Sequence, residues 1–160
     1  MQKVTILCTG KLKEKFYLDA VAEYVKRLSR FCKLEIIELP EERLPEDPSP
    51  AQIEAALSKE ADAVRAKLPN GCLVIAMCVE GRERSSEELA RYLADSAAQG
   101  ASHIVFLIGS SFGMHPSLKQ QADLRLSMSP MTFPHHLLRV MLLEQIYRAY
   151  QINAGSRYHK

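Results

Sequence analysis

The chain has 160 residues, of which 47% are hydrophobic and 25% are charged, and its formal net charge is +2. These values are typical of a soluble globular protein, and they exclude a disordered, collagen-like or disulfide-dense chain. The longest unbroken apolar run, Cys72 to Val79, is far shorter than the roughly 18 residues that a membrane span needs. The N-terminus has no secretory-signal pattern. We therefore expect one cytoplasmic domain over residues 1–160, with no membrane contact.

The four cysteines, Cys8, Cys32, Cys72 and Cys78, form no CxxC pair, so we expect no metal site. Three of them lie in apolar runs, which favours buried, reduced side chains over a redox role. Positive charge gathers at both ends: residues 1–33 hold eight Lys/Arg against three acids, and residues 125–160 hold five against one. Ends that fold together can form a phosphate-binding face, although solvated helix surfaces explain the same pattern.

In the first half of the chain, short apolar runs alternate with helical patterns. Apolar runs bounded by turn residues are typical of buried strands, and apolar side chains three and four residues apart are typical of amphipathic helices. The stretch 40–50 has four prolines and four acids and predicts a loop, whose end at Ser49 and Pro50 favours a helix start. The expected elements are a strand at Val4–Cys8, a helix ending near Leu28, a strand at Leu34–Leu39 and a helix from Pro50 to about Ala66.

The second half continues the alternation after the turn at Asn70 and Gly71. Two of its apolar runs are apolar on both faces, which indicates central strands of a parallel sheet. The expected elements are strands at Cys72–Val79, Ile104–Ile108 and Leu124–Met128, and helices from Ser85 or Ser86 to about Ala98, from Pro116 to Ala122, and from Pro134 to about Ile152. This order predicts an α/β domain with a mostly parallel sheet flanked by helices.

Ligands of such sheets bind beyond the carboxyl ends of the central strands. Three loops are expected there: Glu80–Arg82, Gly109–Gly113 and Ser127–Pro134. The Gly109–Gly113 turn matches neither a P-loop nor G-x-G-x-x-G, but its glycines let backbone come close to a ligand; a plain turn is the alternative. Pro130 and Pro134 stiffen the third loop, which suits a pocket for a flat heterocycle; the alternative is a helix-start loop capped by Thr132.

The last helix has apolar residues almost all round, so we expect it to be buried on all sides, with a second copy of the chain supplying the missing surface in a two-fold homodimer. His135 and Arg139 lie four residues apart, as do Glu144 and Arg148, which can pair. The first pair is either functional or a surface pair at the helix start. The tail ends in Arg157, Tyr158, His159 and Lys160, residue types that contact phosphates and stack on bases, although most tails are frayed.

Taken together, the stretches 106–113, 126–135 and 139–149 and the terminal Tyr158-His159-Lys160 resemble the ribosomal RNA large subunit methyltransferase H family. The likeness runs the whole length of the chain. One departure is visible, because the family commonly has Gly-Gly where this chain has Gly109-Ser110.

The resemblance implies a SPOUT-class enzyme with a C-terminal trefoil knot. It implies an S-adenosylmethionine-dependent methyltransferase that acts on N3 of a pseudouridine in 23S ribosomal RNA of the assembled ribosome, as a homodimer with the donor site near the interface. The implied cofactor-binding residues are Met77, Gly109, Met128, Ser129, Pro130, Met131, Thr132 and Phe133.

Removal of the N3 proton needs a base, for which His159 and His135 are the candidates. Tyr158 is a further catalytic candidate, and Arg139, Arg157 and Lys160 are expected to position RNA phosphates or to stabilise the developing anion. Two other classes stay open. One is a flavodoxin-like or dinucleotide-binding protein, which the missing glycine motifs disfavour, and the other is a non-catalytic ribosome-binding module of the same fold.

Overall fold

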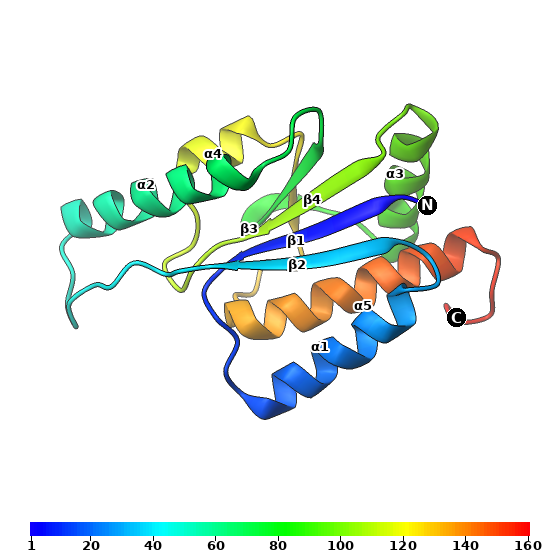
Figure 1. Cartoon of the computed structure of the whole chain (residues 1–160), viewed down its shortest axis with the longest axis horizontal. Helices are drawn as coiled ribbons and strands as arrows, with labels where there is room; N and C mark the ends of the chain where they lie inside the picture. The colour runs from blue at the N-terminus through cyan, green and yellow to red at the C-terminus, as the bar shows by residue number, and fades with distance from the viewer.

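The computed structural model describes all 160 residues and alternates five strands with five helices (Figure 1). The elements are β1 (Lys3–Thr9), α1 (Lys15–Leu28), β2 (Lys33–Leu39), α2 (Pro50–Lys67), β3 (Leu73–Glu83), α3 (Ser86–Ala98), β4 (His103–Ile108), α4 (Pro116–Gln121), β5 (Leu124–Ser127) and α5 (His135–Asn153). The expected α/β class is confirmed. No helix is long and apolar enough to cross a membrane.

The five strands form one sheet in the order β2-β1-β4-β3-β5, and every neighbouring pair is parallel. Ile6 in the middle of β1 pairs with Ile36 on one side and with Phe106 on the other. β4 and β3 therefore lie inside the sheet, as their unbroken apolar sequences predict. Their carboxyl ends open at the same edge of the sheet.

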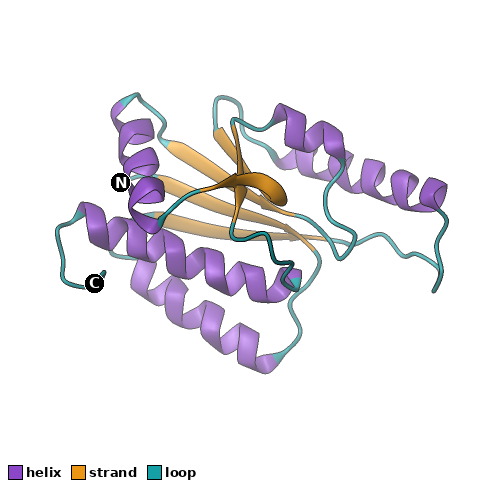
Figure 2. Cartoon of the chain, turned by 180° about the vertical axis from the view of Figure 1, so that it is seen from behind, coloured by secondary structure: helices purple, strands orange, loops and turns teal.

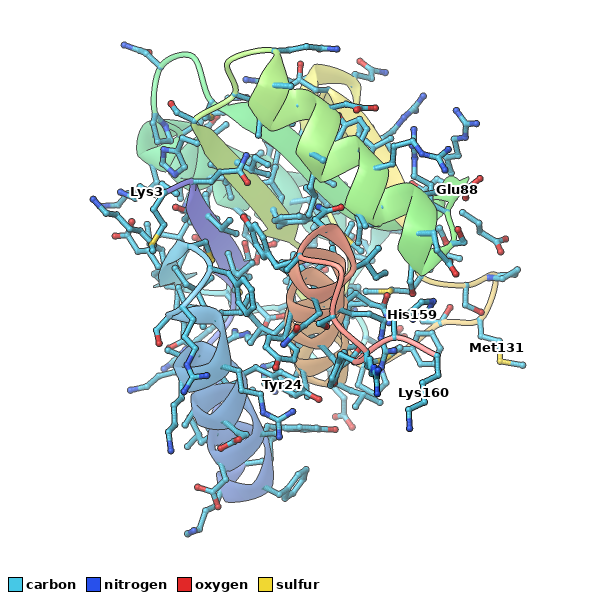
Figure 3. The ribbon with its side chains drawn as sticks, turned by 90° about the vertical axis from the view of Figure 1, so that its right-hand side faces the viewer. Lys3, Tyr24, Glu88, Met131, His159 and Lys160 are labelled. Atoms are coloured by element: carbon cyan, nitrogen blue, oxygen red, sulfur yellow. The ribbon has the colours of Figure 1, made fainter.

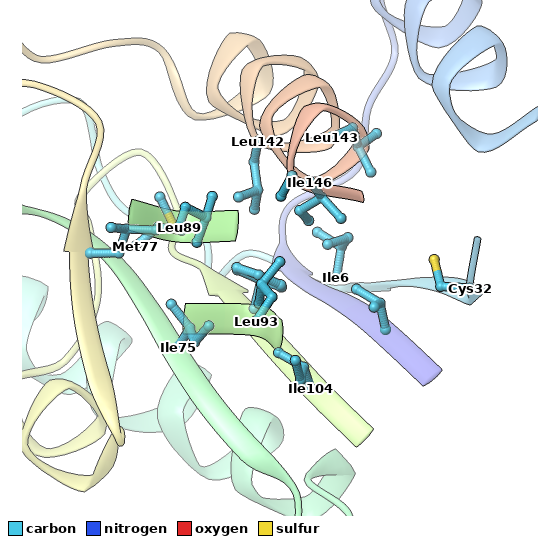
Figure 4. Packing of buried hydrophobic residues seen from close by; sticks show 14 of the residues in the cluster. Ile6, Cys32, Ile75, Met77, Leu89, Leu93, Ile104, Leu142, Leu143 and Ile146 are labelled. Carbon is cyan, nitrogen blue, oxygen red and sulfur yellow. The ribbon is translucent and has the colours of Figure 1, made fainter. Parts of the chain in front are cut away.

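Helices cover both faces of the sheet, and Figure 1 shows α2 and α4 on one side with α1 and α5 on the other. Neighbouring residues of one strand serve different faces: Ile6 packs in the cluster with α1, α3 and α5, whereas Leu7 packs in the cluster with α2 and α4. This two-sided burial explains why the strands are apolar at consecutive positions. Figure 4 shows Leu142, Leu143 and Ile146 of α5 above the sheet in the larger cluster.

Local sequence signals set the starts of α2 and α3. Ser49 accepts a hydrogen bond from the Gln52 amide while the Gln52 side chain accepts from the Ser49 amide, and Ser85 and Glu88 form the same reciprocal pair. Both are capping boxes, which satisfy amides that the first turn of a helix leaves unpaired. Helix α5 has no side-chain cap, because its N-cap is Pro134. The alternative in which Thr132 caps this helix is wrong.

The expected loop at Glu80–Arg82 is also wrong, because β3 continues through it to Glu83. The register against β5 shifts between Met77 and Arg82, so the strand bulges there and then resumes pairing. A Cβ at Gly81 would lie 2.9 Å from backbone atoms of Arg125 and Leu126. Only glycine allows the two backbones to come this close, and Figure 2 shows the curled end of the strand crossing the carboxyl edge of the sheet.

The cysteines are all free. Cys8 and Cys32 are buried, and burial raises the pKa of the Cys8 thiol to about 12, which keeps it protonated and unreactive. Cys72 and Cys78 are partly exposed, so the expected burial holds for Cys8 but is incomplete for these two.

Candidate active site

A cavity of about 710 Å³ opens at the carboxyl ends of β3, β4 and β5. Its walls come from the two expected loops, Gly109–Gly113 and Ser127–Pro134, together with the end of β3 and the first turn of α5. The expected residues that line it are Met77, Gly109, Met128, Ser129, Met131, Thr132, Phe133 and His135. Pro130 does not line it. The cavity has the size and the partly apolar lining of a small-molecule site.

The turn after β4 is closed by two backbone hydrogen bonds between Ser110 and Gly113, of 3.0 and 2.9 Å. A Cβ at Gly109 would lie 2.3 Å from the Gly113 carbonyl oxygen, and Gly113 itself has a φ of +90°. Position 109 therefore has no room for a Cβ beside the carbonyl of the same turn, so glycine is needed there whether or not a ligand comes close.

Two carboxylates from distant segments hold the turn in place. The Ser110 hydroxyl donates to Glu60 Oε1 over 2.8 Å, and both the amide and the hydroxyl of Ser111 donate to Glu41 Oε1, over 3.0 and 2.6 Å. Glu60 is only 7% exposed, and its other oxygen accepts from the Glu42 amide. Burial raises the pKa of Glu60 above its usual range, while these two donors oppose the rise.

The opposite wall is fixed within its own loop. The Ser127 hydroxyl donates to the Ser129 carbonyl over 2.9 Å, and the Ser129 hydroxyl accepts from the Met131 amide over 3.0 Å. Phe112 and Met131 line the cavity yet are 46% and 72% exposed, so they stand at its mouth. Figure 3 shows Met131 at the outer tip of its loop.

Glu80 and Lys119 close the rim where the bulge of β3 meets α4. The hydrogen bond from Lys119 lowers the pKa of Glu80, so this carboxylate is ionised at neutral pH. Sequence patterns miss it, because the bulge that carries Glu80 toward α4 reads as a loop.

Arg139 is 3% exposed and donates to Glu38 Oε2 over 2.7 Å and to the Gly10 carbonyl over 3.2 Å. It is therefore a buried tie between α5, β2 and the end of β1, and the expectation of a surface pair with His135 is wrong. The guanidinium does not line the cavity. Glu38 also accepts from the Leu12 amide, and these donors outweigh its desolvation and lower its pKa.

His135 lines the cavity and packs against Gly10, where a Cβ would lie 3.3 Å from its Nε2. That nitrogen is buried without a hydrogen-bond partner. Burial, and secondarily the neighbouring His136, lowers the pKa of His135, so the imidazole is neutral at pH 7. The His136 ring lies 4.1 Å from the His135 ring, centroid to centroid, and its Nδ1 contacts Glu14 over 3.2 Å.

The C-terminal tail folds back on α5 and does not line the cavity. Tyr158 donates to Glu144 over 3.0 Å, and His159 lies between Arg148 at 3.1 Å and Glu87 at 2.8 Å. The predicted pair of Glu144 and Arg148 is confirmed at 2.6 Å. Arg157 and Lys160 are exposed and form no ion pair. Figure 3 shows His159 and Lys160 on the outside of the molecule.

The tail nevertheless lies near the cavity. Glu144, which accepts from Tyr158, lines a second hollow of about 420 Å³. This hollow shares Leu126, Ser127 and Met128 with the main cavity, so only this short segment separates the two.

The family model described as "Predicted SPOUT methyltransferase" matches residues 2–159, so the chain belongs to the SPOUT methyltransferase family. Proteins named ribosomal RNA large subunit methyltransferase H from Streptococcus uberis and Bifidobacterium adolescentis are each 48% identical to it, over 99% of this chain and 99% of theirs. The expected family resemblance is thereby confirmed.

Similarity to solved structures supports the fold and nothing further. A probable methylase family protein from Haemophilus influenzae Rd KW20 superposes with a TM-score of 0.51 at 13% identity, covering 99% of this chain and 70% of that one.

Proposed function

We propose that the chain transfers a methyl group from S-adenosylmethionine to N3 of a pseudouridine in 23S ribosomal RNA, within the assembled ribosome. One observation carries the proposal: seven of the eight expected cofactor-binding residues, all but Pro130, line one cavity at the carboxyl ends of β3, β4 and β5. The full-length relatives named ribosomal RNA large subunit methyltransferase H support the substrate class.

The cavity suits S-adenosylmethionine by size and by chemistry. Its volume lies within the ordinary range of small-molecule sites, and half of its 22 lining residues are hydrophobic. Polar groups of the Gly109–Gly113 turn, Ser129 and Thr132 line the cavity, and Met77 and Met128 add adaptable apolar surface. When bound, the donor supplies an electrophilic methyl group on a sulfonium sulfur. The chain's main contribution is to align donor and acceptor.

His135 is the residue we assign to take the N3 proton. It lines the cavity, and its lowered pKa leaves it as the neutral base at pH 7. His159 is less suited in the observed arrangement. Arg148 can only donate, so His159 Nδ1 is an acceptor and Nε2–H faces Glu87, which leaves neither nitrogen free.

The roles we assign to the three basic candidates depend on whether their side chains are buried or exposed. Arg139 acts as a positioning residue, because its guanidinium is bound to Glu38 and to the carbonyl of Gly10, the residue beside which His135 packs. Arg157 and Lys160 are exposed and unpaired, and we assign RNA phosphates to them. Tyr158 holds the tail on Glu144, beside the second hollow.

A homodimer and a C-terminal trefoil knot belong to the same proposal. Only Arg139, Leu142, Leu143, Ile146 and Ala149 of α5 are buried within one chain. Leu137, Val140 and Met141 are half-exposed, and a second copy would cover them. The glycine that brings β3 and β5 to backbone contact supports a tight crossing of the C-terminal segments. We also propose that the 160 residues act as one domain in the cytoplasm.

The decisive experiment incubates the purified chain and S-adenosylmethionine with ribosomes from cells that lack this protein, followed by mass spectrometry of 23S rRNA fragments. We expect one added methyl group on a pseudouridine, and deletion of Tyr158–Lys160 should abolish it while calorimetric donor affinity persists. Donor binding without methylation of any RNA would favour a ribosome-binding module. Absence of donor binding would overturn the proposal.

A further inference from the structure

A polar groove of about 510 Å³ runs along the outer edge of the sheet, beside β3, β5 and α4. It shares Glu80 and Lys119 with the main cavity, so the two spaces meet at the closed rim pair. Of its lining residues only Ala122 and Leu124 are hydrophobic. The groove therefore does not suit an apolar ligand.

Some charged side chains of the groove have a partner and others have none. Glu80 is bound to Lys119, and Asp123 accepts from the Val74 amide over 2.8 Å. Arg82 and Arg125 are exposed and have no carboxylate within ion-pair distance.

Four other arginines, Arg27, Arg65, Arg139 and Arg148, each have a carboxylate partner within 3.4 Å. The groove thus presents two unsatisfied guanidinium groups, although acids line it as well.

Backbone pairing places these two arginines on adjacent strands, and both line the groove. Arg82 pairs with Leu126, the residue after Arg125, just where β3 resumes its register beyond the bulge. Arg125 also helps to lower the pKa of Glu80, which places its charge beside the rim. A guanidinium presents a planar fork of donors that matches a phosphate, and two neighbouring forks can hold one stretch of a polyanion.

We propose that this groove binds the phosphodiester backbone of the RNA on the approach to the cavity, with Arg82 and Arg125 as the contacting residues. The inference rests on the proposed function for the identity of the polyanion. None of the groove's lining residues belongs to the tail, so Arg157 and Lys160 on one side and this groove on the other form separate contacts with the RNA.

The test replaces both arginines, Arg82→Gln with Arg125→Gln, and compares this protein with a matched control, Arg30→Gln with Arg43→Gln. Arg30 and Arg43 are also exposed and unpaired, so the control removes the same charge elsewhere. Co-sedimentation with large ribosomal subunits measures affinity at several KCl concentrations, and methyl transfer to unmodified ribosomes gives KM and kcat. Calorimetry with S-adenosylmethionine checks the cavity.

We expect the groove variant to bind large subunits about tenfold more weakly, with KM raised, kcat nearly unchanged and donor affinity unchanged. The slope of log affinity against log salt should fall by about 1.4, because two phosphate contacts of about 0.7 each are lost. The control should keep the wild-type slope. Equal losses in both variants would indicate net charge alone and would overturn the proposal, as would no loss in the groove variant.

Two further arms separate the remaining outcomes. A photoreactive benzophenone amino acid in place of Gln120, which lines the groove, should crosslink to ribosomal RNA; crosslinks to ribosomal protein alone would overturn the assignment to RNA. If the wild-type chain transfers no methyl group, the proposed function fails, and co-sedimentation still decides whether the groove binds the large subunit.

Discussion

The Glu60 carboxylate of α2 lies 2.8 Å from the Ser110 hydroxyl, fifty residues further along the chain, in a buried hydrogen bond behind the cavity wall. The second oxygen of Glu60 accepts from the Glu42 amide. One buried side chain thus ties the acidic loop before α2 to the turn that follows β4.

Removing either partner of this bond should loosen the turn. For Glu60→Ala and for Ser110→Ala we expect the dissociation constant of S-adenosylmethionine to rise about tenfold, since a hydrogen bond to a charged group contributes about 1.5–3 kcal/mol. Isothermal titration calorimetry measures the change. Ser111→Ala is the matched control, because the Ser111 amide keeps its bond to Glu41. Similar affinities for all three variants would contradict a positioning role for Glu60.

The pH dependence of stability has a defined sign. The pKa of Glu60 is raised in the folded state, so its contribution to the free energy of unfolding is complete below the unfolded pKa and is lost as pH rises through the folded pKa. The wild-type chain should therefore lose stability relative to Glu60→Gln as pH increases from about 4. Urea unfolding of both proteins at a series of pH values measures this difference, and a wild-type chain that gains stability relative to Glu60→Gln as pH rises would refute it.

His135→Gln should lower kcat for methyl transfer by about 10²-fold or more, with donor affinity nearly unchanged. Because burial lowers the pKa of His135, its imidazole should stay in the base form down to pH values below about 6.5, and the wild-type rate should hold over the same range. Single-turnover rates across pH 5–8 measure both effects. His103→Gln is the control, since His103 contacts Thr5 in the sheet and does not line the cavity. Equal rates for the two variants would remove the role of His135.

Gly109→Ala should destabilise the fold as well as weaken donor binding. Its Cβ would lie 2.3 Å from the Gly113 carbonyl, and forcing such a contact costs about 1–3 kcal/mol. Denaturant unfolding and calorimetry measure the two effects. In the control Gly71→Ala, no atom lies near the new Cβ, so only the strain of the φ of +73° remains and donor affinity should not change. Wild-type affinity in Gly109→Ala would show that the turn does not form the donor site.

Arg139→Gln should destabilise the chain by about 2 kcal/mol, less than a fully buried ion pair because the Glu38 side chain is one-third exposed. The exposed pair of Lys15 and Asp19 is the comparison, where Lys15→Gln should change the free energy of unfolding by less than about 0.5 kcal/mol. Thermal and urea unfolding measure both changes. Equal changes in the free energy of unfolding for the two variants would mean that the buried contacts of Arg139 do not stabilise the fold.

The fold was predictable because its signals are local. Apolar runs that serve two faces, and Ser-initiated capping boxes at α2 and α3, stand in contiguous sequence. The end of β3 was not, since Glu80-Gly81-Arg82 is held in the sheet by a bulge against β5 and carries no strand pattern.

The cavity was predictable from the rule that ligands bind beyond strand ends, and two of the three expected loops do line it. The contacts that hold those loops were not. Glu60 meets Ser110 across 50 positions and Arg139 meets Glu38 across 101, and no local period encodes such pairs. The first of these contacts gives Ser110 a role in holding the turn.

All residues that line the cavity fall between Met77 and Leu138, yet the anchors of its glycine turn, Glu41 and Glu60, precede them. During synthesis, Glu41 and Glu60 therefore leave the ribosome before any residue that lines the cavity. Incomplete translation products that stop before α5 would lack His135 and Leu138, and so they would carry an incomplete cavity.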